Sequence, residues 1–429
     1  MKDTSATQFP LRTLARWFSC GVLFILGLWV GLVHADETTI REQFHPYNRS
    51  TPQVLGLEPG VTITAANVQQ AREVLPTELV QLVTAGDLAL PIQKTTDLPP
   101  RATYLDATVQ YSQNVSLQDS RVLAHYHAGA PFPLLDPADP QAGEKLAWNL
   151  RYRDMGEGFE LRANPRQLNS GGGVEHSNRG LMKIRFGMYR PNPADNDPQW
   201  QAQGVYMKNS FELLAPSDQE GIISLRTFYD DDTRQTEQWR YSPQNRRTRK
   251  DTVNYVTPIG GYYEMLQEEQ PPFFFQGYLH DYEWHFDGQR VMLMPGFLAA
   301  PTINYGGKNG WYPQVPWELR RVYVLTCSPR HAHPFGKRVF FLDQQTYTPL
   351  LAISYDASGA FVRLMITGHA YPHGHPGSNG VPLPMLVGAA WINYAKEHAT
   401  LFTAGDTMIF NPPLSAQRFE LMEILRKGK

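Results

Sequence analysis

The chain has 429 residues and a formal net charge of −2, with 39 basic and 41 acidic side chains. Its length suits one large domain or two ordinary domains, and it is long enough to bury a sizeable core. The nearly balanced charge argues against a globally basic protein that binds nucleic acid.

The first 35 residues have the pattern of a signal peptide. Three basic residues precede an apolar run over 17–33, and the sequence "VHA" at 33–35 is typical of a cleavage site. We therefore expect residues 1–35 to direct export and to be removed. The alternative is an uncleaved membrane anchor, because the run is about long enough to span a bilayer. Cleavage would leave Cys327 as the single cysteine, and an exported chain without disulfides suits a bacterial periplasm.

Residues 36–100 are predicted to form an N-terminal arm followed by short helices. Residues 36–60 are polar and rich in proline, which is typical of an extended arm. One helix is expected after an N-cap at Thr64, and a second helix from Thr77 to Gly86.

Residues 101–429 are predicted to form one mainly β domain. Short runs rich in β-branched and aromatic residues, beginning with "YLDATVQ", are bounded by Gly, Pro, Asn and Asp. The pair Ser358-Gly359 predicts a turn between two strands, and Asp287-Gly288 is the strongest short hairpin signal in the chain. Consecutive strands without crossover helices indicate an antiparallel meander.

Several of the expected strands are apolar on both faces, for example "VFFL" and "AFVRLMI". A sheet with one wet face alternates more cleanly, so we expect helices or a ligand cavity against the concave side. The C-terminal tail is predicted to be a short helix capped by Ser415. Phe419, Met422 and Leu425 share one stripe of this helix, which we interpret as core packing.

Two loops carry histidine at matching spacings. They contain Cys327, His331 and His333, and His369, His373 and His375. Zinc or copper accepts such ligands, but Pro and Gly surround them and no carboxylate or second Cys stands at ligand spacing. We expect exposed loop histidines and neither a metal nor a cofactor. The chain also lacks a nucleophile elbow, a phosphate-binding glycine loop and a zinc helix, so no catalytic residue is assigned.

The stretch "PPFFFQGYLHDYEW" at 271–284 is dense in aromatic residues. Such density is usually that of a core, and it is also what would line a cavity for an acyl chain. The candidate ligand-cavity residues are therefore Phe273, Phe274, Phe275, Tyr278 and Trp284. The acidic run at 229–234 is expected to be a solvated hairpin tip.

The stretch "QWRYSPQNRRTRK" combines aromatic residues with a basic cluster. Period-two alternation puts Trp239 and Tyr241 on the face opposite Gln238 and Arg240, and the two aromatics join the cavity candidates. The turn sequence after Tyr241 splits the stretch into two strands of a hairpin.

The basic residues of this hairpin are expected at its rim, beside the acidic run at 229–234. Because no other basic surface is visible, nucleic acid is not the expected partner. Arg246 and Arg247 are instead candidates for contact with an anionic head group or an acidic partner protein. Binding at such a surface should weaken as salt is added.

Several stretches together resemble one known family, domain of unknown function 1329. The supporting stretches span most of the mature chain and include "TITAAN", "AGAPFPLLDPADPQAGEKLAWNLRYR", "QWRYSPQNRRTRK", "HDYEWHFDGQRVMLMP" and "WELRRVYVLTC". The family consists of Gram-negative periplasmic proteins that are often described as outer-membrane lipoprotein-sorting proteins, because they look like LolA and LolB. The resemblance implies a mainly β (α+β) fold, a strongly curved antiparallel half-barrel closed by short helices.

The resemblance also implies a function without catalysis. LolA-like proteins hold acyl chains in an apolar cavity, and members of this family are associated with RND-type exporters and an outer-membrane partner. We expect a periplasmic carrier of a lipid, a lipoprotein acyl chain or another hydrophobic molecule. The alternatives are a ligand-free adaptor of an exporter complex and, less favoured, a metal-dependent enzyme that uses the histidine loops. The helices at 64–85 and the loop around Phe273 to Phe275 are candidates for a movable cover.

Overall fold

The computed structural model describes residues 37–118, 122–371, 375–404 and 407–427. The predicted signal peptide lies outside the described residues. Within these ranges, no helix combines the length and the apolar character that crossing a membrane requires.

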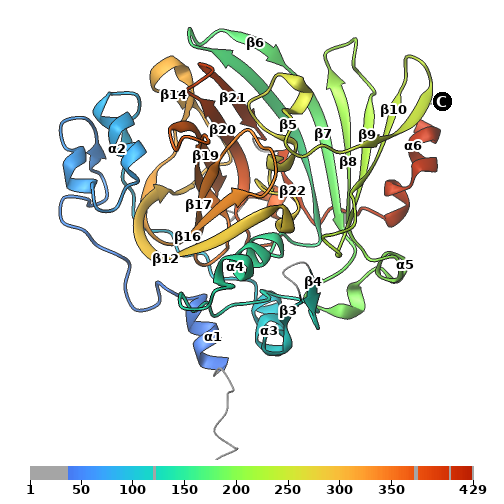
Figure 1. The fold of residues 1–429 in the computed structure, drawn as a ribbon, viewed down its shortest axis with the longest axis horizontal. Helices are drawn as coiled ribbons and strands as arrows, with labels where there is room; N and C mark the ends of the chain where they lie inside the picture. The colour runs from blue at the N-terminus through green and yellow to red at the C-terminus, as the bar shows by residue number, and fades with distance from the viewer. Residues whose placement is uncertain (1–36, 119–121, 372–374, 405–406, 428–429) are drawn as a thin grey trace, which may run out of the picture.

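A 16-stranded sheet is the frame of the molecule (Figure 1). Its strands follow the order β11-β10-β9-β8-β7-β5-β21-β20-β19-β18-β17-β16-β12, and β6, β22 and β13 join from the side. The end strands β11 and β12 do not pair with each other within the described residues, so the sheet is open. The main strands are β5 (Gly158–Asn169), β7 (Arg179–Phe186), β8 (Val205–Ala215), β9 (Ile223–Tyr229), β10 (Glu237–Ser242), β11 (Arg247–Thr252), β12 (Tyr282–Pro295), β16 (Trp317–Pro329), β17 (Lys337–Asp343), β18 (Pro349–Tyr355), β19 (Phe361–Ala370), β20 (Met385–Asn393) and β21 (His398–Thr403).

Short strands complete the β structure. The strands that join the main sheet from the side are β6 (Val174–Ser177), β13 (Phe297–Leu298) and β22 (Ile409–Phe410). Three two-stranded ladders pair β1 (Thr62–Ile63) with β2 (Leu90–Pro91), β3 (Ser116–Gln118) with β4 (Val122–Ala124), and β14 (Tyr305–Gly306) with β15 (Tyr312–Pro313).

Contacts of two adjacent residues show that the sheet is strongly curved. Gln267 accepts a 2.6 Å hydrogen bond from Arg226 on β9, whereas Glu268 lies 2.9 Å from Arg338 on β17. These strands are eight steps apart along the order β9-β8-β7-β5-β21-β20-β19-β18-β17. In a flat sheet they would be roughly 38 Å apart, at about 4.8 Å per strand. The sheet therefore curls around residues 267–268, which confirms the expected curved antiparallel half-barrel.

The central strands are buried on both faces. In β16, Tyr323 and Leu325 belong to one hydrophobic cluster, whereas Val322 and Val324 belong to another. We call the face with Tyr323 the inner face and the face with Val322 the outer face. All nine residues of β20 are buried. Double burial explains why these strands lack a clean alternation of polar and apolar residues, and it confirms the expectation of an apolar cover on the concave side.

Two helices form where the sequence indicated other structure. The helix α1 (Glu37–Gln43) lies in the expected extended arm, because Ile40 anchors it in the cluster of the inner face. The helix α3 (Ala102–Tyr111) contains the run "YLDATVQ", which the sequence indicated as a strand. Its buried residues include Tyr104 and Thr108, which are four positions apart on one helical face. Burial of this face overrides the β propensity of the run.

The predicted helix after Thr64 is only a short 3₁₀ turn, η1 (Val68–Ala71), whereas α2 (Thr77–Thr84) forms as expected. Val68 and Leu79 are buried in the cluster of the outer face. The remaining helices of the sheet region are α4 (Ala142–Arg151), which packs against β12, and α5 (Pro198–Ala202).

One predicted hairpin is confirmed and another is wrong. The turn at Ser358-Gly359 joins β18 to β19, and the Asp356 carboxylate accepts hydrogen bonds from the backbone of this turn. By contrast, Asp287-Gly288 lies inside the single strand β12. There β16 pairs along both halves of β12, and the register shifts across the dipeptide. Gly288, with φ of +95°, therefore serves a β-bulge rather than a turn.

The C-terminal tail is interrupted rather than one continuous helix. It forms the 3₁₀ helix η10 (Ala416–Phe419) and the helix α6 (Leu421–Lys427), with an extended Glu420 between them. Phe419 is buried as expected, but Met422 is 73% exposed. The predicted common stripe is therefore wrong for Met422, because the extended residue breaks the helical phase. The side chain of Leu425 lies outside the described residues.

Candidate functional site

The segment between the two end strands, residues 253–281, crosses the inner face of the sheet. We call it the crossing segment. It contacts β9 through Gln267, β5 through the Tyr263 hydroxyl, and β21 through a hydrogen bond from the Glu264 backbone to Thr400. The chain itself therefore fills much of the space that the curved sheet encloses.

Buried ion pairs hold the crossing segment against the sheet. Glu268 lies 2.9 Å from Arg338 and accepts a 2.5 Å hydrogen bond from Tyr282, and Glu269 pairs with Arg363 at 2.5 Å. Burial opposes ionisation of Glu268, but Arg338, His333 and Tyr282 outweigh it, so the pKa of Glu268 lies below its ordinary value. The carboxylate is therefore charged at neutral pH and binds the segment to β17.

The three phenylalanines of the crossing segment are core residues. Phe273, Phe274 and Phe275 are at most 5% exposed. The Phe274 ring lies 5.9 Å from that of Trp391 on β20, and the Phe275 ring lies 6.1 Å from that of Phe340 on β17. Of the two alternatives that the sequence left open for this stretch, a core or a ligand cavity, these rings form a core inside the half-barrel.

Two further candidates, Tyr278 and Trp284, lie around the end of the crossing segment. The Tyr278 hydroxyl accepts a hydrogen bond from the Thr236 backbone, and the ring packs edge-on against Tyr255. Trp284 packs against Phe275. Tyr278 thus joins the crossing segment to the residue before β10, and Trp284 of β12 packs against the segment.

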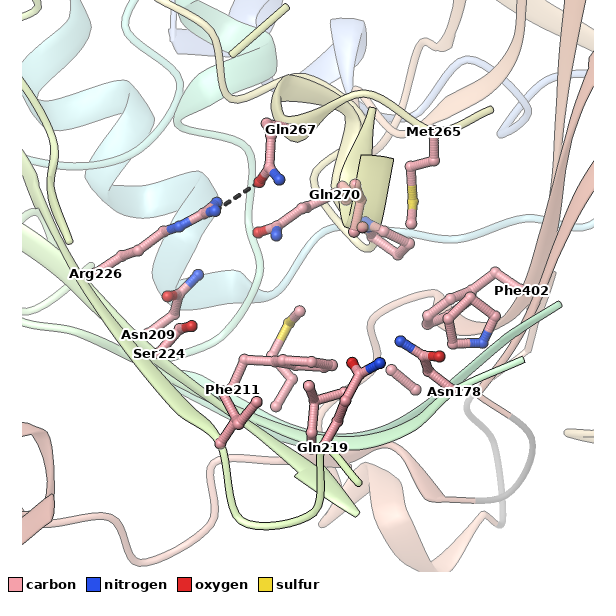
Figure 2. Close-up of a pocket in the computed structure, with 18 of the residues that line it drawn as sticks. Asn178, Asn209, Phe211, Gln219, Ser224, Arg226, Met265, Gln267, Gln270 and Phe402 are labelled. Atoms are coloured by element: carbon pink, nitrogen blue, oxygen red, sulfur yellow. Dashed lines mark hydrogen bonds between the residues drawn. The ribbon is translucent and has the colours of Figure 1, made fainter. Parts of the chain in front are cut away.

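A cavity of about 370 Å³ remains between the crossing segment and strands β5 and β7–β10. Figure 2 shows its walls: Phe402 and Asn178 lie at one end, whereas Arg226, Asn209 and Ser224 lie at the opposite end. The apolar lining residues include Met182, Phe211, Leu213, Ile222, Met265 and Phe402. The volume is at the lower end of the range for small-molecule sites, about 300–1,000 Å³. The arrangement can bind a molecule that is largely apolar and polar at one end.

Trp239 and Tyr241 lie on the other side of the sheet from this cavity. Their neighbours Gln238 and Arg240 line the cavity, as the strand alternation requires. Tyr241 is buried in a separate cluster with Phe419, and Trp239 packs against the same cluster. The predicted opposition of the two pairs is confirmed, and it places the aromatics outside the cavity wall.

Arg246 and Arg247 are exposed at the turn between β10 and β11, so the predicted hairpin is confirmed. The prediction that these arginines lie beside the acidic run 229–234 is wrong. The run 229–234 precedes β10 and lies at its opposite end, whereas the turn of Arg246 contacts the β8–β9 turn through a hydrogen bond from Gln244 to the Asp218 carbonyl.

The run 229–234 is also less solvated than expected. Asp232 is 2% exposed and pairs with Arg151 and His280. Burial opposes its ionisation, but these two partners lower the pKa of Asp232 below its ordinary value. The acidic run is therefore partly a structural anchor for α4, which carries Arg151.

Among the described residues, the histidines of the two loops do not gather into one metal-binding group. His369 is buried between the rings of Phe274 and Phe297, His331 is exposed, and His373 lies outside the described residues. Cys327 is buried, and burial raises the pKa of its thiol to about 12. Within the described residues, no group of three or more His, Cys, Asp or Glu side chains could hold a metal.

Sequence reasoning missed the polar end of the cavity. Arg226 and Ser224 alternate along β9 and face inward beside Asn209 of β8. The signal was present, because "ISLRTFY" places a charged residue in the middle of an otherwise uncharged strand. A charge at such a position is costly unless something nearby uses it.

Of the two cover elements expected from the sequence, the helices at 64–85 lie elsewhere, whereas the loop around Phe273 to Phe275 belongs to the crossing segment. The turn η1 and the helix α2 pack on the outer face, whereas the cavity opens on the inner face. The crossing segment contributes Ile259, Met265 and Gln270 to the cavity wall. It is therefore the segment whose position determines the size of the cavity.

The fold and the cavity define a class of protein with an open antiparallel half-barrel, which encloses a crossing segment and a mainly apolar cavity. Residues 62–419 match the family model for the protein of unknown function DUF1329, and the chain belongs to this family. The expected family resemblance is therefore confirmed.

Comparison with individual proteins gives more distant similarities. An uncharacterized protein of Pseudomonas aeruginosa is 26% identical over 332 residues, which cover 72% of this chain and 68% of that protein. A DUF1329 family protein from Desulfovibrio piger has 14% identity and a TM-score of 0.47, covering 67% of this chain and all of the other. A LolA superfamily protein from Nitrosomonas europaea has 9% identity and a TM-score of 0.39, covering 64% of this chain and 94% of the other.

Proposed function

We propose that the protein is a periplasmic carrier that holds a hydrophobic or amphipathic molecule in the cavity beneath the crossing segment. The observation that carries this proposal is the cavity itself, about 370 Å³ in volume and walled by Met182, Phe211, Leu213 and Phe402. An apolar molecule gains about 0.8 kcal/mol for each CH₂ group that leaves water. A cavity of this kind is what such a molecule needs in order to cross an aqueous compartment.

The size of the cavity favours a small cargo. Its volume equals that of about a dozen water molecules at roughly 30 Å³ each. One acyl chain or one small amphipathic molecule fits this space, whereas several chains would require the crossing segment to move. The proposal therefore favours a single-chain lipid or another small hydrophobic molecule over a multiply acylated lipoprotein.

The proposal includes export and delivery. The apolar run at 17–33 supports export through a signal peptide. An RND-type exporter and an outer-membrane protein are the proposed partners, because family members of this type are associated with such systems. The exposed Arg246 and Arg247 are the proposed contact with a head group or with an acidic partner surface.

Native mass spectrometry with lipid extraction tests the carrier function. Protein purified without detergent from membrane-containing cells should retain a bound lipid or a similar molecule. Ile222→Trp, which fills the cavity wall, should reduce the bound fraction, whereas Val174→Trp at an exposed position should not. Protein that is always recovered empty, and that still binds an exporter, would favour the adaptor alternative.

A further inference from the structure

The polar end of the cavity is built around the buried Arg226. Its side chain lies in the middle of β9 and is 7% exposed. Nε donates a 2.5 Å hydrogen bond to Oε1 of Gln238, and one terminal nitrogen, Nη2, donates a 2.6 Å bond to Oε1 of Gln267. The other terminal nitrogen, Nη1, is buried and has no hydrogen-bond partner among the described residues. Figure 2 shows the guanidinium beside Gln267 and Gln270, with Asn209 nearby.

The charge of Arg226 lacks a counterion in the part of the chain that the structure describes. No carboxylate there lies within 4 Å of it, and both of its hydrogen-bond partners are neutral amides. Four other buried arginines face carboxylates: Arg190, Arg320, Arg338 and Arg363. A fifth, Arg153, donates to three backbone carbonyls. A buried cation with an unused hydrogen-bond donor is costly. The guanidinium of Arg226 is therefore suited to bind an anion.

The other charged residue of the lining, Arg240, has the same sign of charge. The side chain of Arg240 makes no hydrogen bond or ion pair with the described residues, and no Asp or Glu contributes to this lining. The register places Arg240 opposite Ser224 on one side and Arg249 on the other. A second groove shares Arg240 with the cavity and continues to Arg247 and Arg249. Arginine side chains therefore line a continuous path from the exposed hairpin to the cavity.

We propose that the cavity binds a single-chain amphipathic anion, with the anionic head group at Arg226 and the chain along the apolar wall. A carboxylate or a phosphate oxygen would accept a hydrogen bond from Nη1 and compensate the buried charge. The chain would lie against Phe211, Met265 and Phe402. This inference rests on the proposed carrier function and specifies the chemical class of the cargo.

Calorimetric titration with three twelve-carbon probes tests the inference: dodecanoate, dodecyl phosphate and the uncharged dodecanol, each below its aggregation threshold. The wild type should bind at least one of the two anions about tenfold or more tightly than the alcohol, as expected for a charge-assisted hydrogen bond. The tighter anion identifies the carboxylate or the phosphate as the preferred head group.

Arg226→Met should remove the preference for the anion and leave the affinity for dodecanol unchanged. The variant should unfold at the same temperature as the ligand-free wild type or at a higher one, because it removes an uncompensated buried charge. Arg72→Gln, at an exposed position on the outer-face side, is the matched control, and its affinities should stay within about threefold of the wild type. If Arg226→Met does not fold, Arg240→Gln at a half-buried position should reduce the preference for the anion.

Two outcomes separate this inference from the proposal on which it depends. Equal affinity for anion and alcohol in the wild type would overturn the inference and leave the carrier function intact. A lower unfolding temperature in Arg226→Met, with an equal loss of affinity for all three probes, would also overturn the inference, because Arg226 would then have a structural role. Failure of the wild type to bind any probe would contradict the carrier function itself.

Discussion

Glu268 of the crossing segment and Arg338 of β17 form an ion pair, 2.9 Å apart, in which both side chains are at most 3% exposed. The charges are close, although the guanidinium N–H groups are not aligned on the carboxylate as hydrogen bonds. Arg338 also lies 3.2 Å from Glu269, which pairs with Arg363. Two consecutive glutamates thus connect the crossing segment to two strands, and the cavity wall depends on this connection.

Loss of one partner of this network should be strongly destabilising. Arg338→Met leaves Glu268 and Glu269 with one fewer buried counterion, and breaking a buried pair in this way typically costs about 3–5 kcal/mol of unfolding free energy. Urea unfolding at neutral pH measures the effect. The matched control is Arg330→Met, because Arg330 pairs with Glu283 on the surface, and it should cost at most about 1 kcal/mol. Equal effects of the two substitutions would contradict a structural role of the network.

The buried His369 should make stability depend on pH. Burial, with a smaller contribution from Arg153, lowers the pKa of His369 to about 3, whereas an unfolded histidine titrates near 6.5. Between these values the unfolded chain binds a proton that the folded chain does not. The free energy of unfolding should therefore decrease as pH falls below about 6.5, by up to about 1.4 kcal/mol per pH unit.

The His369 prediction is checked by urea unfolding at pH 7 and pH 5. Between these two conditions the wild type should lose about 2 kcal/mol more than His369→Gln, which removes the titrating group. His285→Gln, at an exposed position, should retain the wild-type dependence. If the unfolding free energy of His369→Gln depended on pH as steeply as that of the wild type, the imidazole would be hydrated in the folded protein.

The packing of α4 on β12 depends on the absence of a side chain at Gly143. A Cβ atom there would lie 2.4 Å from the carbonyl oxygen of Trp284, which is backbone and has no flexible end to move. Gly143→Ala should therefore cost about 1–3 kcal/mol of unfolding free energy through overpacking. Gly171→Ala, where the nearest heavy atom is 3.4 Å away on an Asn169 side chain, should be close to neutral. A neutral Gly143→Ala would show that α4 can shift away from the sheet.

Local patterns predicted much of the β architecture. Alternation along "EQWRYS" placed Gln238 and Arg240 on one face and the two aromatics on the other, and the structure has this arrangement. Patterns failed where tertiary contacts decide the outcome. Asp287-Gly288 has the chemistry of a turn, but continuous pairing with β16 on both sides turns it into a bulge.

The candidate site was less predictable than the fold. The aromatic density around Phe274 is compatible with either a core or a cavity, and only the path of the crossing segment shows that these rings fill the interior. The charge at Arg226 is visible in the sequence, but its partners come from residues 12 and 41 positions away. Such long-range pairing has no local signature, so the polar end of the cavity could not be located from periodicity.

The exposed arginines of the β10–β11 hairpin should contribute salt-dependent binding. The double variant Arg246→Glu, Arg247→Glu reverses two charges at the outer end of the groove that Arg247 and Arg249 line. Because these side chains are exposed, attraction to an anionic surface is screened within about 8 Å at physiological salt. The variant should bind anionic phospholipid vesicles several-fold more weakly than the wild type at low salt, and the difference should shrink as salt is added. Arg72→Glu, at an exposed position on the outer-face side, is the matched control and should bind like the wild type. Vesicle co-sedimentation across a salt series measures the effect, and equal binding by the double variant and the wild type would reduce Arg246 and Arg247 to solvated surface residues.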